Sequence, residues 1–106
     1  MSEERIASLK HFLAQEPNDT MLLFGLGNDY YELGQCAEAI TYFERALQVD
    51  PEYAAVYVRL ALAYEGNDQL AMARQTLERG REPIVRSQDR NLLAESEELW
   101  EHLQGA

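Results

Sequence analysis

The feature that most constrains the fold of this chain is an interval of thirty-four residues at which similar side chains recur. The first unit carries Leu23, Gly25, Leu26, Gly27, Tyr30, Ala39, Phe43, Ala46 and Pro51, and thirty-four residues later stand Tyr57, Arg59, Leu60, Ala61, Tyr64, Ala73, Leu77, Gly80 and Val85. A fixed period of this length indicates a repeat array, because one unit cannot bury its apolar face until a neighbour stacks on it. We therefore expect an extended surface rather than a deep pocket.

The same interval extends toward the N-terminus. Leu9, Phe12 and Pro17 precede Phe43, Ala46 and Pro51 by thirty-four residues. We therefore expect residues 1–17 to copy the second half of a unit, so that the array starts in mid-repeat.

Apolar residues at helical spacing, separated by turn residues, predict helices and no strand. The predicted helices cover about 2–15, 20–33, 36–49, 52–65 and 69–80, and one more follows residue 89. We expect Gly34 to supply a left-handed turn after the second helix and Asp68 to cap the fifth. Pro83 lacks a backbone donor, so the fifth helix should end near Gly80 or kink before Ile84.

The two units resemble the tetratricopeptide repeat (TPR) family, whose unit is a pair of helices joined by a turn. The residues that carry the resemblance in unit one are Leu23, Leu26, Gly27, Tyr30, Ala39, Phe43, Ala46 and Pro51. Unit two departs from the pattern, because Gly80 replaces the usual alanine and Val85 stands where proline is expected. The resemblance implies an all-α fold, namely an antiparallel helix-turn-helix repeat array with terminal capping helices. Such an array is an α-solenoid fragment, as in small bacterial-type proteins of two repeats.

The expected organisation is a single domain over residues 1–106. It comprises an N-terminal half-repeat (1–17), repeat one (20–53), repeat two (54–87) and a C-terminal capping helix (88–106). The last helix carries a stripe made of Leu92, Ser96, Leu99 and Leu103. We expect this stripe to cover the open end of unit two. The alternative is that Leu93 and Trp100 stay exposed and pair with a second copy.

In the TPR family the first helix of each unit lines a concave face, so the resemblance implies a binding groove. Its expected residues are Met21, Phe24, Gly25, Asn28 and Tyr31 from unit one, and Ala55, Val58, Arg59, Leu62 and Glu65 from unit two. Such a groove suits a peptide, with Arg59 and Asn28 holding a carboxylate or backbone groups. Gly25 is unfavourable in a helix and is interpreted as leaving room for a ligand. The alternative is that Met21 and Phe24 pack under the N-terminal helix or against another copy.

Some co-chaperones of this family hold the C-terminal carboxylate of a chaperone with one lysine, two asparagines and further basic residues. Only Asn28 matches those positions here, because Phe24 stands at the place of the lysine and Arg59 at the place of the second asparagine. The resemblance therefore does not imply that activity for this chain.

The formal charge of -10 argues against nucleic acid as a partner, because phosphate binding requires clustered Lys and Arg. A basic or neutral protein partner is expected instead. No run is as long as a membrane span and the first residues are acidic, so we expect a cytoplasmic protein that does not bind membranes. The lone Cys36 is interpreted as a passive thiol, the alternative being a redox-reactive one.

No catalytic or metal-binding constellation is recognised, and no cofactor is expected. His11 and His102 lie in opposite end helices and lack the paired Glu-x-x-His pattern of a dimetal site. The sequence therefore predicts a protein that is not an enzyme but an adaptor or scaffold, which binds a peptide or protein segment on its concave face. The alternative is a structural homo-oligomer, for example a homodimer, assembled through the groove or the C-terminal helix.

Overall fold

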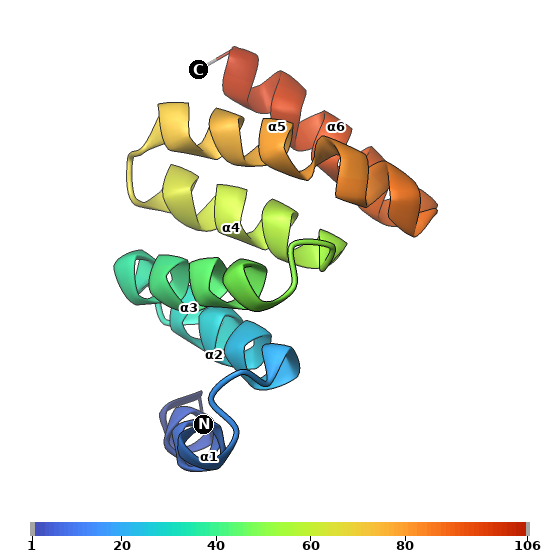
Figure 1. The fold of residues 1–106 in the computed structure, drawn as a ribbon. Helices are drawn as coiled ribbons and strands as arrows, with labels where there is room; N and C mark the ends of the chain where they lie inside the picture. The colour runs from blue at the N-terminus through green and yellow to red at the C-terminus, as the bar shows by residue number, and fades with distance from the viewer. Residues whose placement is uncertain (1, 106) are drawn as a thin grey trace.

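The computed structural model describes residues 2–105, and within that range the chain forms α-helices and no strand. The helices are α1 (Ser2–Gln15), α2 (Thr20–Glu32), α3 (Cys36–Val49), α4 (Ala54–Gly66), α5 (Leu70–Ser87) and α6 (Arg90–Gln104). They stack in chain order from α1 at one end to α6 at the other, as Figure 1 shows. The predicted all-α repeat array is confirmed. Met1 and Ala106, the end residues of the expected domain, lie outside the described residues.

The turns between helices follow the local side-chain chemistry. Asp19 caps α2 by accepting hydrogen bonds from the backbone N–H groups of Met21 (2.9 Å) and Leu22 (3.1 Å). Gly34 has φ of 77°, the left-handed conformation that glycine adopts without strain. The left-handed turn at Gly34 is the one predicted from the sequence.

Asp68 does not cap α5, so that part of the prediction is wrong. Asp68 has φ of 59° and thus takes the left-handed position that Gly34 holds thirty-four residues earlier. Aspartate tolerates this conformation better than most residues. The N-cap of α5 is Gln69, whose side chain makes no capping hydrogen bond.

The fifth helix does not end near Gly80, so the first of the two alternatives expected at Pro83 is wrong. Helix α5 continues through Pro83 to Ser87, although a proline inside a helix removes one hydrogen bond and costs about 3 kcal/mol. Pro83 and Ile84 are both buried. Burial of the last turns of α5 therefore offsets the hydrogen bond that Pro83 cannot make.

The helices form two layers. Each helix contacts its neighbours in the sequence, and α2 also contacts α4, while α4 also contacts α6. Among the described residues, the backbones of α1, α3 and α5 make no such contacts with one another. The layer of α2, α4 and α6 is therefore the tighter, inner side of the curve, as expected for the concave side of a solenoid.

Two glycines allow helices of a pair to approach closely. A Cβ atom at Gly27 of α2 would overlap the Phe43 ring of α3, and one at Gly80 of α5 would overlap the Tyr57 side chain of α4. Large aromatic rings therefore occupy the space that side chains at these positions would take. Both rings are buried in the core that runs through the array.

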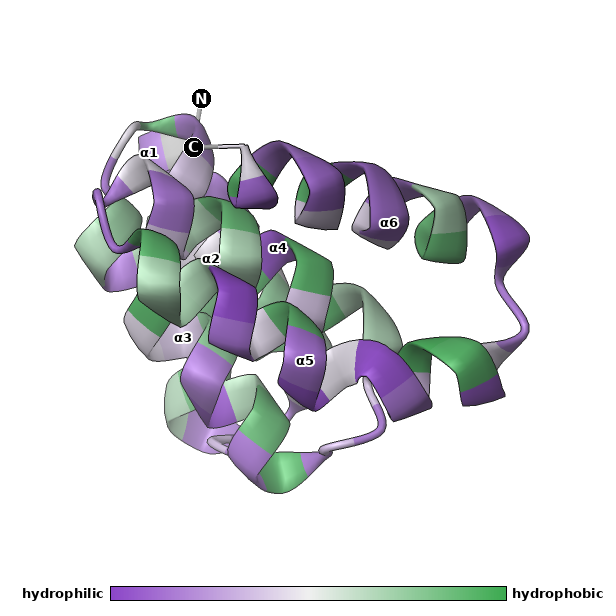
Figure 2. Ribbon diagram, turned by 90° about the horizontal axis from the view of Figure 1, so that it is seen from above, coloured by the Kyte–Doolittle hydropathy of each residue, from purple (hydrophilic) through white to green (hydrophobic). Residues whose placement is uncertain are grey.

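Helix α6 runs back along α5, and its ribbon is mostly hydrophilic with separate hydrophobic turns (Figure 2). Leu99 and Leu103 are buried, and the Arg74 guanidinium of α5 donates to the backbone carbonyl of Leu103 at 3.1 Å. Glu97 and Glu101 are exposed, and Trp100 is half-buried. No helix in the range 2–105 is long and apolar enough to cross a bilayer.

Candidate functional site

The inner face is the candidate site, and we define it by Met21 and Asn28 of α2 with Arg59 and Leu62 of α4. Met21 and Asn28 are about two helical turns apart on α2. On α4 the half-buried Ala55 and Leu62 have the same separation, and Arg59 lies between them. Helices α2 and α4 contact each other, so these residues come from adjacent helices of the inner layer. The following paragraphs give the place of every residue expected there.

On α2, Met21 is 76% exposed and does not pack under the N-terminal helix. Phe24 is half-buried in an aromatic group, with its ring centre 5.9 Å from that of Phe43 and 5.1 Å from that of Tyr53. Burial raises the pKa of the Tyr53 hydroxyl, and the carboxylates of Asp50 and Asp19 raise it further. Phe24 therefore forms an apolar edge of the inner face, while Met21 projects from it.

Gly25 lies beside α1 rather than beside an open space. A Cβ atom at Gly25 would stand 3.4 Å from Leu9 Cδ1 of α1, within ordinary van der Waals contact. Leu9 of α1 occupies the space in front of Gly25, so Gly25 leaves no room for a ligand. The same side of α2 carries Asp29, whose Oδ2 atom forms an ion pair with Arg5 Nε of α1 at 3.0 Å.

Asn28 offers an unused hydrogen-bond acceptor. Its Oδ1 atom is buried and has no hydrogen-bond partner among the described residues. Buried polar atoms normally have a partner, because leaving one without a hydrogen bond costs about 1–3 kcal/mol. Tyr31, one turn further along α2, is half-buried. Because Oδ1 is buried, a ligand would contact only the accessible part of the half-buried Asn28 side chain.

On α4, the expected residues separate into surface and core. Val58 is completely buried, so we leave it out of the inner face. Leu62 is half-buried and Arg59 is exposed. Glu65 Oε2 lies 2.7 Å from Nε2 of His102 in α6, so this contact joins two helices of the inner layer.

Arg59 stands out among the cations of the chain. Of the nine Lys and Arg residues, seven contact an acidic group, a backbone carbonyl or an aromatic ring: Arg5, Lys10, Arg45, Arg74, Arg79, Arg81 and Arg86. Within residues 2–105, Arg59 and Arg90 have no such contact. Arg90 begins α6, away from α4, so Arg59 is the free guanidinium on the inner face.

The sequence prediction missed the contribution of α6 to this face. His102 reaches Glu65, and Glu98 and Glu95 precede His102 by four and seven residues, so they lie on the same side of the helix. Both glutamates are exposed. The four-residue spacing of Glu98 and His102 is visible in the sequence, but nothing in it indicates which neighbour they face. The inner face thus has a cation on α4 and an acidic edge on α6.

This geometry defines a curved helical-repeat protein with a concave face, and comparison with known proteins agrees. A family model described as TPR repeat matches residues 27–68. A TPR repeat-containing protein of Pseudomonas aeruginosa is 35% identical over 75 residues, which cover 71% of each chain. This chain belongs to the TPR repeat family.

Two solved structures have the same fold. The TPR2B domain of yeast Sti1, solved as a pHsp70 complex, superimposes with a TM-score of 0.91 at 19% identity, covering 98% of this chain and 83% of that chain. A protein of Bordetella parapertussis, solved in solution, gives a TM-score of 0.80 at 28% identity, covering 93% of this chain and 86% of that chain. TPR repeats are in general modules of protein interaction without catalytic activity.

Proposed function

We propose that this protein is a non-catalytic adaptor whose inner face binds a short peptide segment of another protein in the cytoplasm. The single observation that carries this proposal is Arg59, an exposed guanidinium on the inner face with no contact to an acidic group or an aromatic ring in the described structure. A guanidinium binds a carboxylate with two parallel hydrogen bonds. The partner should therefore place a carboxylate at Arg59.

The surroundings of Arg59 define the rest of the segment. The half-buried amide of Asn28 would hydrogen-bond a backbone group of the peptide. Met21 and Leu62 provide apolar contact for a side chain of the peptide. Glu95 and Glu98 favour a basic residue toward α6. The proposed ligand is thus a short segment with an apolar residue, a carboxylate and a basic residue.

The Sti1 domain with the same fold was solved with pHsp70, which supports peptide binding as a use of this architecture. The ligand of that domain is not assigned to this chain, because the two sequences are only 19% identical. In addition, Phe24 packs against Phe43 and Tyr53 at the position where a clamp lysine would be needed. The recognition proposed here depends on Arg59 instead.

A random peptide library displayed on phage, selected against the full chain, tests the proposal. Selected peptides should share an acidic residue, and Arg59→Ala should weaken their binding by roughly tenfold or more, because a charge-assisted hydrogen bond contributes about 1.5–3 kcal/mol. Arg90→Ala is the matched control, since Arg90 is also exposed and without an ionic contact in residues 2–105, but lies outside the inner face. Peptides that bind both variants equally, or that shift NMR signals of α3 and α5 only, would contradict the proposal.

A homo-oligomer is the second candidate. It is favoured by one observation, an unfilled groove between α5 and α6 that contains Leu93 and Trp100. This groove is distinct from the inner face, so self-association through it and peptide binding can coexist.

A further inference from the structure

The groove between α5 and α6 is a hollow of about 600 Å³ on the side of α6 opposite to His102. Its apolar walls are Leu77 and Val85 of α5 with Leu93 and Trp100 of α6. Val85 is 56% exposed, and Leu93 and Trp100 are half-buried. Apolar side chains gathered along an exposed groove indicate a surface that binds another molecule.

The dimensions of the groove define the shape of its occupant. Leu77 and Val85 are eight residues apart, so the wall that α5 provides is about 12 Å long, at a rise of about 1.5 Å per residue. Leu93 and Trp100 are seven residues apart on the facing wall. Both lengths correspond to two turns of an α-helix. An amphipathic helix that presents apolar residues at i, i+3 or i+4, and i+7 therefore matches both walls.

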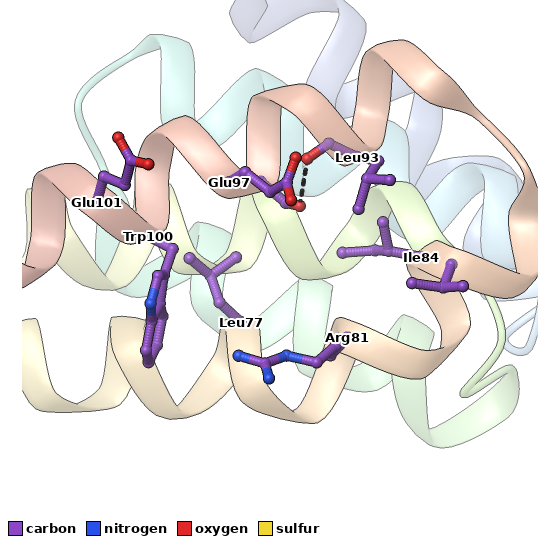
Figure 3. A pocket seen from close by; sticks show the side chains of 9 residues that line it. Leu77, Arg81, Ile84, Leu93, Glu97, Trp100 and Glu101 are labelled. Carbon is purple, nitrogen blue, oxygen red and sulfur yellow. Dashed lines mark hydrogen bonds between the residues drawn. The ribbon is translucent and has the colours of Figure 1, made fainter.

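The charged groups of this hollow differ in number and in pairing. Glu97 and Glu101 of α6 line it, are exposed, and form no ion pair within residues 2–105. Arg81 of α5 lines the same hollow. Figure 3 shows the Arg81 guanidinium directed toward the Trp100 ring, and the centres of the two groups are 5.9 Å apart. The single cation is thus held by an aromatic ring, while the two carboxylates are available to basic side chains of a ligand.

The groove continues toward the turn between α5 and α6 as a second hollow of about 460 Å³, which Val85 and Leu93 also line. Asp89 and Arg90 border this part, and their charges are opposite. Asp89 also accepts a hydrogen bond from the backbone N–H of Leu92 at 3.0 Å, as the N-cap of α6. This end of the groove adds no net charge, so the excess charge of the whole groove is negative.

We propose that the α5/α6 groove binds a basic amphipathic helix of another protein. Apolar residues of that helix would contact Leu93 and Trp100, and lysine or arginine on its flank would pair with Glu97 and Glu101. Charge favours a different protein over a second copy of this chain, because two copies with a formal charge of -10 each repel one another. The groove is separate from the inner face, so this inference does not depend on peptide binding at Arg59.

Two synthetic peptides test the charge preference with the full chain. The basic probe contains two copies of the heptad Leu-Lys-Lys-Leu-Leu-Lys-Leu, with blocked ends, and the acidic probe has glutamate in place of each lysine. Trp100 is the only tryptophan of the chain and neither probe contains one, so its fluorescence reports occupation of the groove. The basic probe should shift Trp100 emission to shorter wavelength. It should bind about tenfold more tightly than the acidic probe, since each exposed ion pair contributes up to about fivefold.

Matched variants locate the binding on the molecule. Val85→Arg places a positive charge in the groove and should weaken binding of the basic probe by about tenfold or more. Val49→Arg adds the same charge at an exposed apolar residue of α3 and should change the affinity by no more than about twofold. Leu93→Arg is a second groove variant, and circular dichroism should show unchanged helix content in all three.

The charged residues of the groove give a change in each direction. Arg81→Gln removes the guanidinium and should tighten binding of the basic probe by up to about fivefold. Glu97→Gln and Glu101→Gln should each weaken it by up to about the same factor. A weaker complex with Arg81→Gln would contradict the proposed charge preference.

Three further results would overturn the proposal. Acidic probe that binds as tightly as the basic one would mean that Arg81 governs recognition. Equal weakening by Val85→Arg and Val49→Arg would mean that the basic probe follows the charge of the whole chain. A mass that rises with concentration in sedimentation velocity without peptide, and that Val85→Arg abolishes, would mean that a second copy fills the groove. Arg59→Ala should bind the basic probe like the unmodified chain, even if the function proposed above is wrong.

Discussion

Gly80 of α5 packs directly against the side chain of Tyr57 of α4, and a Cβ atom at Gly80 would lie 2.9 Å from Tyr57 Cδ1. The corresponding residues in unit one, thirty-four positions earlier, are Ala46 and Leu23, both completely buried. In unit two the small residue of the pair is glycine instead of alanine, and the large residue is tyrosine instead of leucine. The absence of the usual alanine at Gly80 is therefore compensated across the helix pair.

This relationship gives the first prediction, which concerns Gly80→Ala. Alanine gains about 1 kcal/mol of helix propensity, but overpacking against Tyr57 costs about 1–3 kcal/mol, so the free energy of unfolding in urea should fall or at best stay level. Combining Gly80→Ala with Tyr57→Leu should be less destabilising than the sum of the two single changes. Strictly additive effects in this double-mutant cycle would mean that the two residues are not in contact.

The second prediction contrasts two glycines of α2. Gly25→Ala meets Leu9 at ordinary contact distance and should stabilise the protein by about 0.5–1 kcal/mol through helix propensity. Gly27→Ala would overlap the Phe43 ring and should destabilise it by about 1–3 kcal/mol. Thermal unfolding of both variants checks the contrast. If Gly25→Ala is the more damaging change, α1 does not pack on α2 as described.

The third prediction is a loss of stability at alkaline pH. Burial and, after it, the hydrogen bond to Glu44 raise the pKa of Tyr64 from 10.0 to about 12. Since the folded-state pKa is above the unfolded value, this stabilisation is complete below pH 10 and is lost as the pH rises toward 12. Unfolding free energies measured between these values should fall with pH.

Tyr64→Phe is the test of that assignment. At neutral pH the free energy of unfolding of this variant should be lower by about 1 kcal/mol, because the hydrogen bond from the Tyr64 hydroxyl is lost. Above pH 10 its stability should fall less steeply than that of the unmodified chain. Glu44 of α3 keeps its ion pair with Arg79 of α5, at 3.3 Å, so the substitution removes only the hydrogen bond of the Tyr64 hydroxyl. An absorbance titration that shows the same number of late-ionising tyrosines in both proteins would refute it.

The fourth prediction concerns the anchoring of α6. Leu103 is completely buried and Leu33, at the end of α2, is 38% exposed. Leu103→Ala should cost about 2–5 kcal/mol in urea unfolding, as for other buried leucines, whereas Leu33→Ala should cost well under half of that. Equal effects of the two substitutions would show that α6 is not docked on the array in solution.

Most of the fold could be predicted from the sequence, because the repeat fixes the packing partners of each helix. The interval that relates Phe43 to Leu77 also relates their neighbours, and α1 and α3 begin and end where predicted. Of the two alternatives expected at Pro83, an end of α5 near Gly80 was wrong, because propensity at Pro83 is local whereas the burial of Ile84 depends on tertiary packing. Asp68 was wrongly predicted to be an N-cap, because aspartate is common both at N-caps and at turn positions with a left-handed backbone.

The candidate site was predictable only in part. Helical spacing places Met21, Asn28 and Arg59 on one side of their helices, but it does not show which side a neighbouring helix covers. Val58 has the spacing of a surface residue and is buried. Gly25 faces α1, and the acidic edge of α6 depends on how that helix is docked. Such facts follow from the arrangement of whole helices, not from any one of them.

Within residues 2–105, the contacts between helices are almost all between neighbours in the sequence, with only α2–α4 and α4–α6 added. Stability is then transmitted along the array step by step, and the strength of any helix depends on how many neighbours support it. Helix α4 has contacts with α2, α3, α5 and α6, whereas α1 has contacts with α2 alone. Amide hydrogens should therefore exchange slowest in α4 and fastest in α1. A ligand that bridges α2 and α4 would act on the most rigid part of the molecule and would leave its ends free to open.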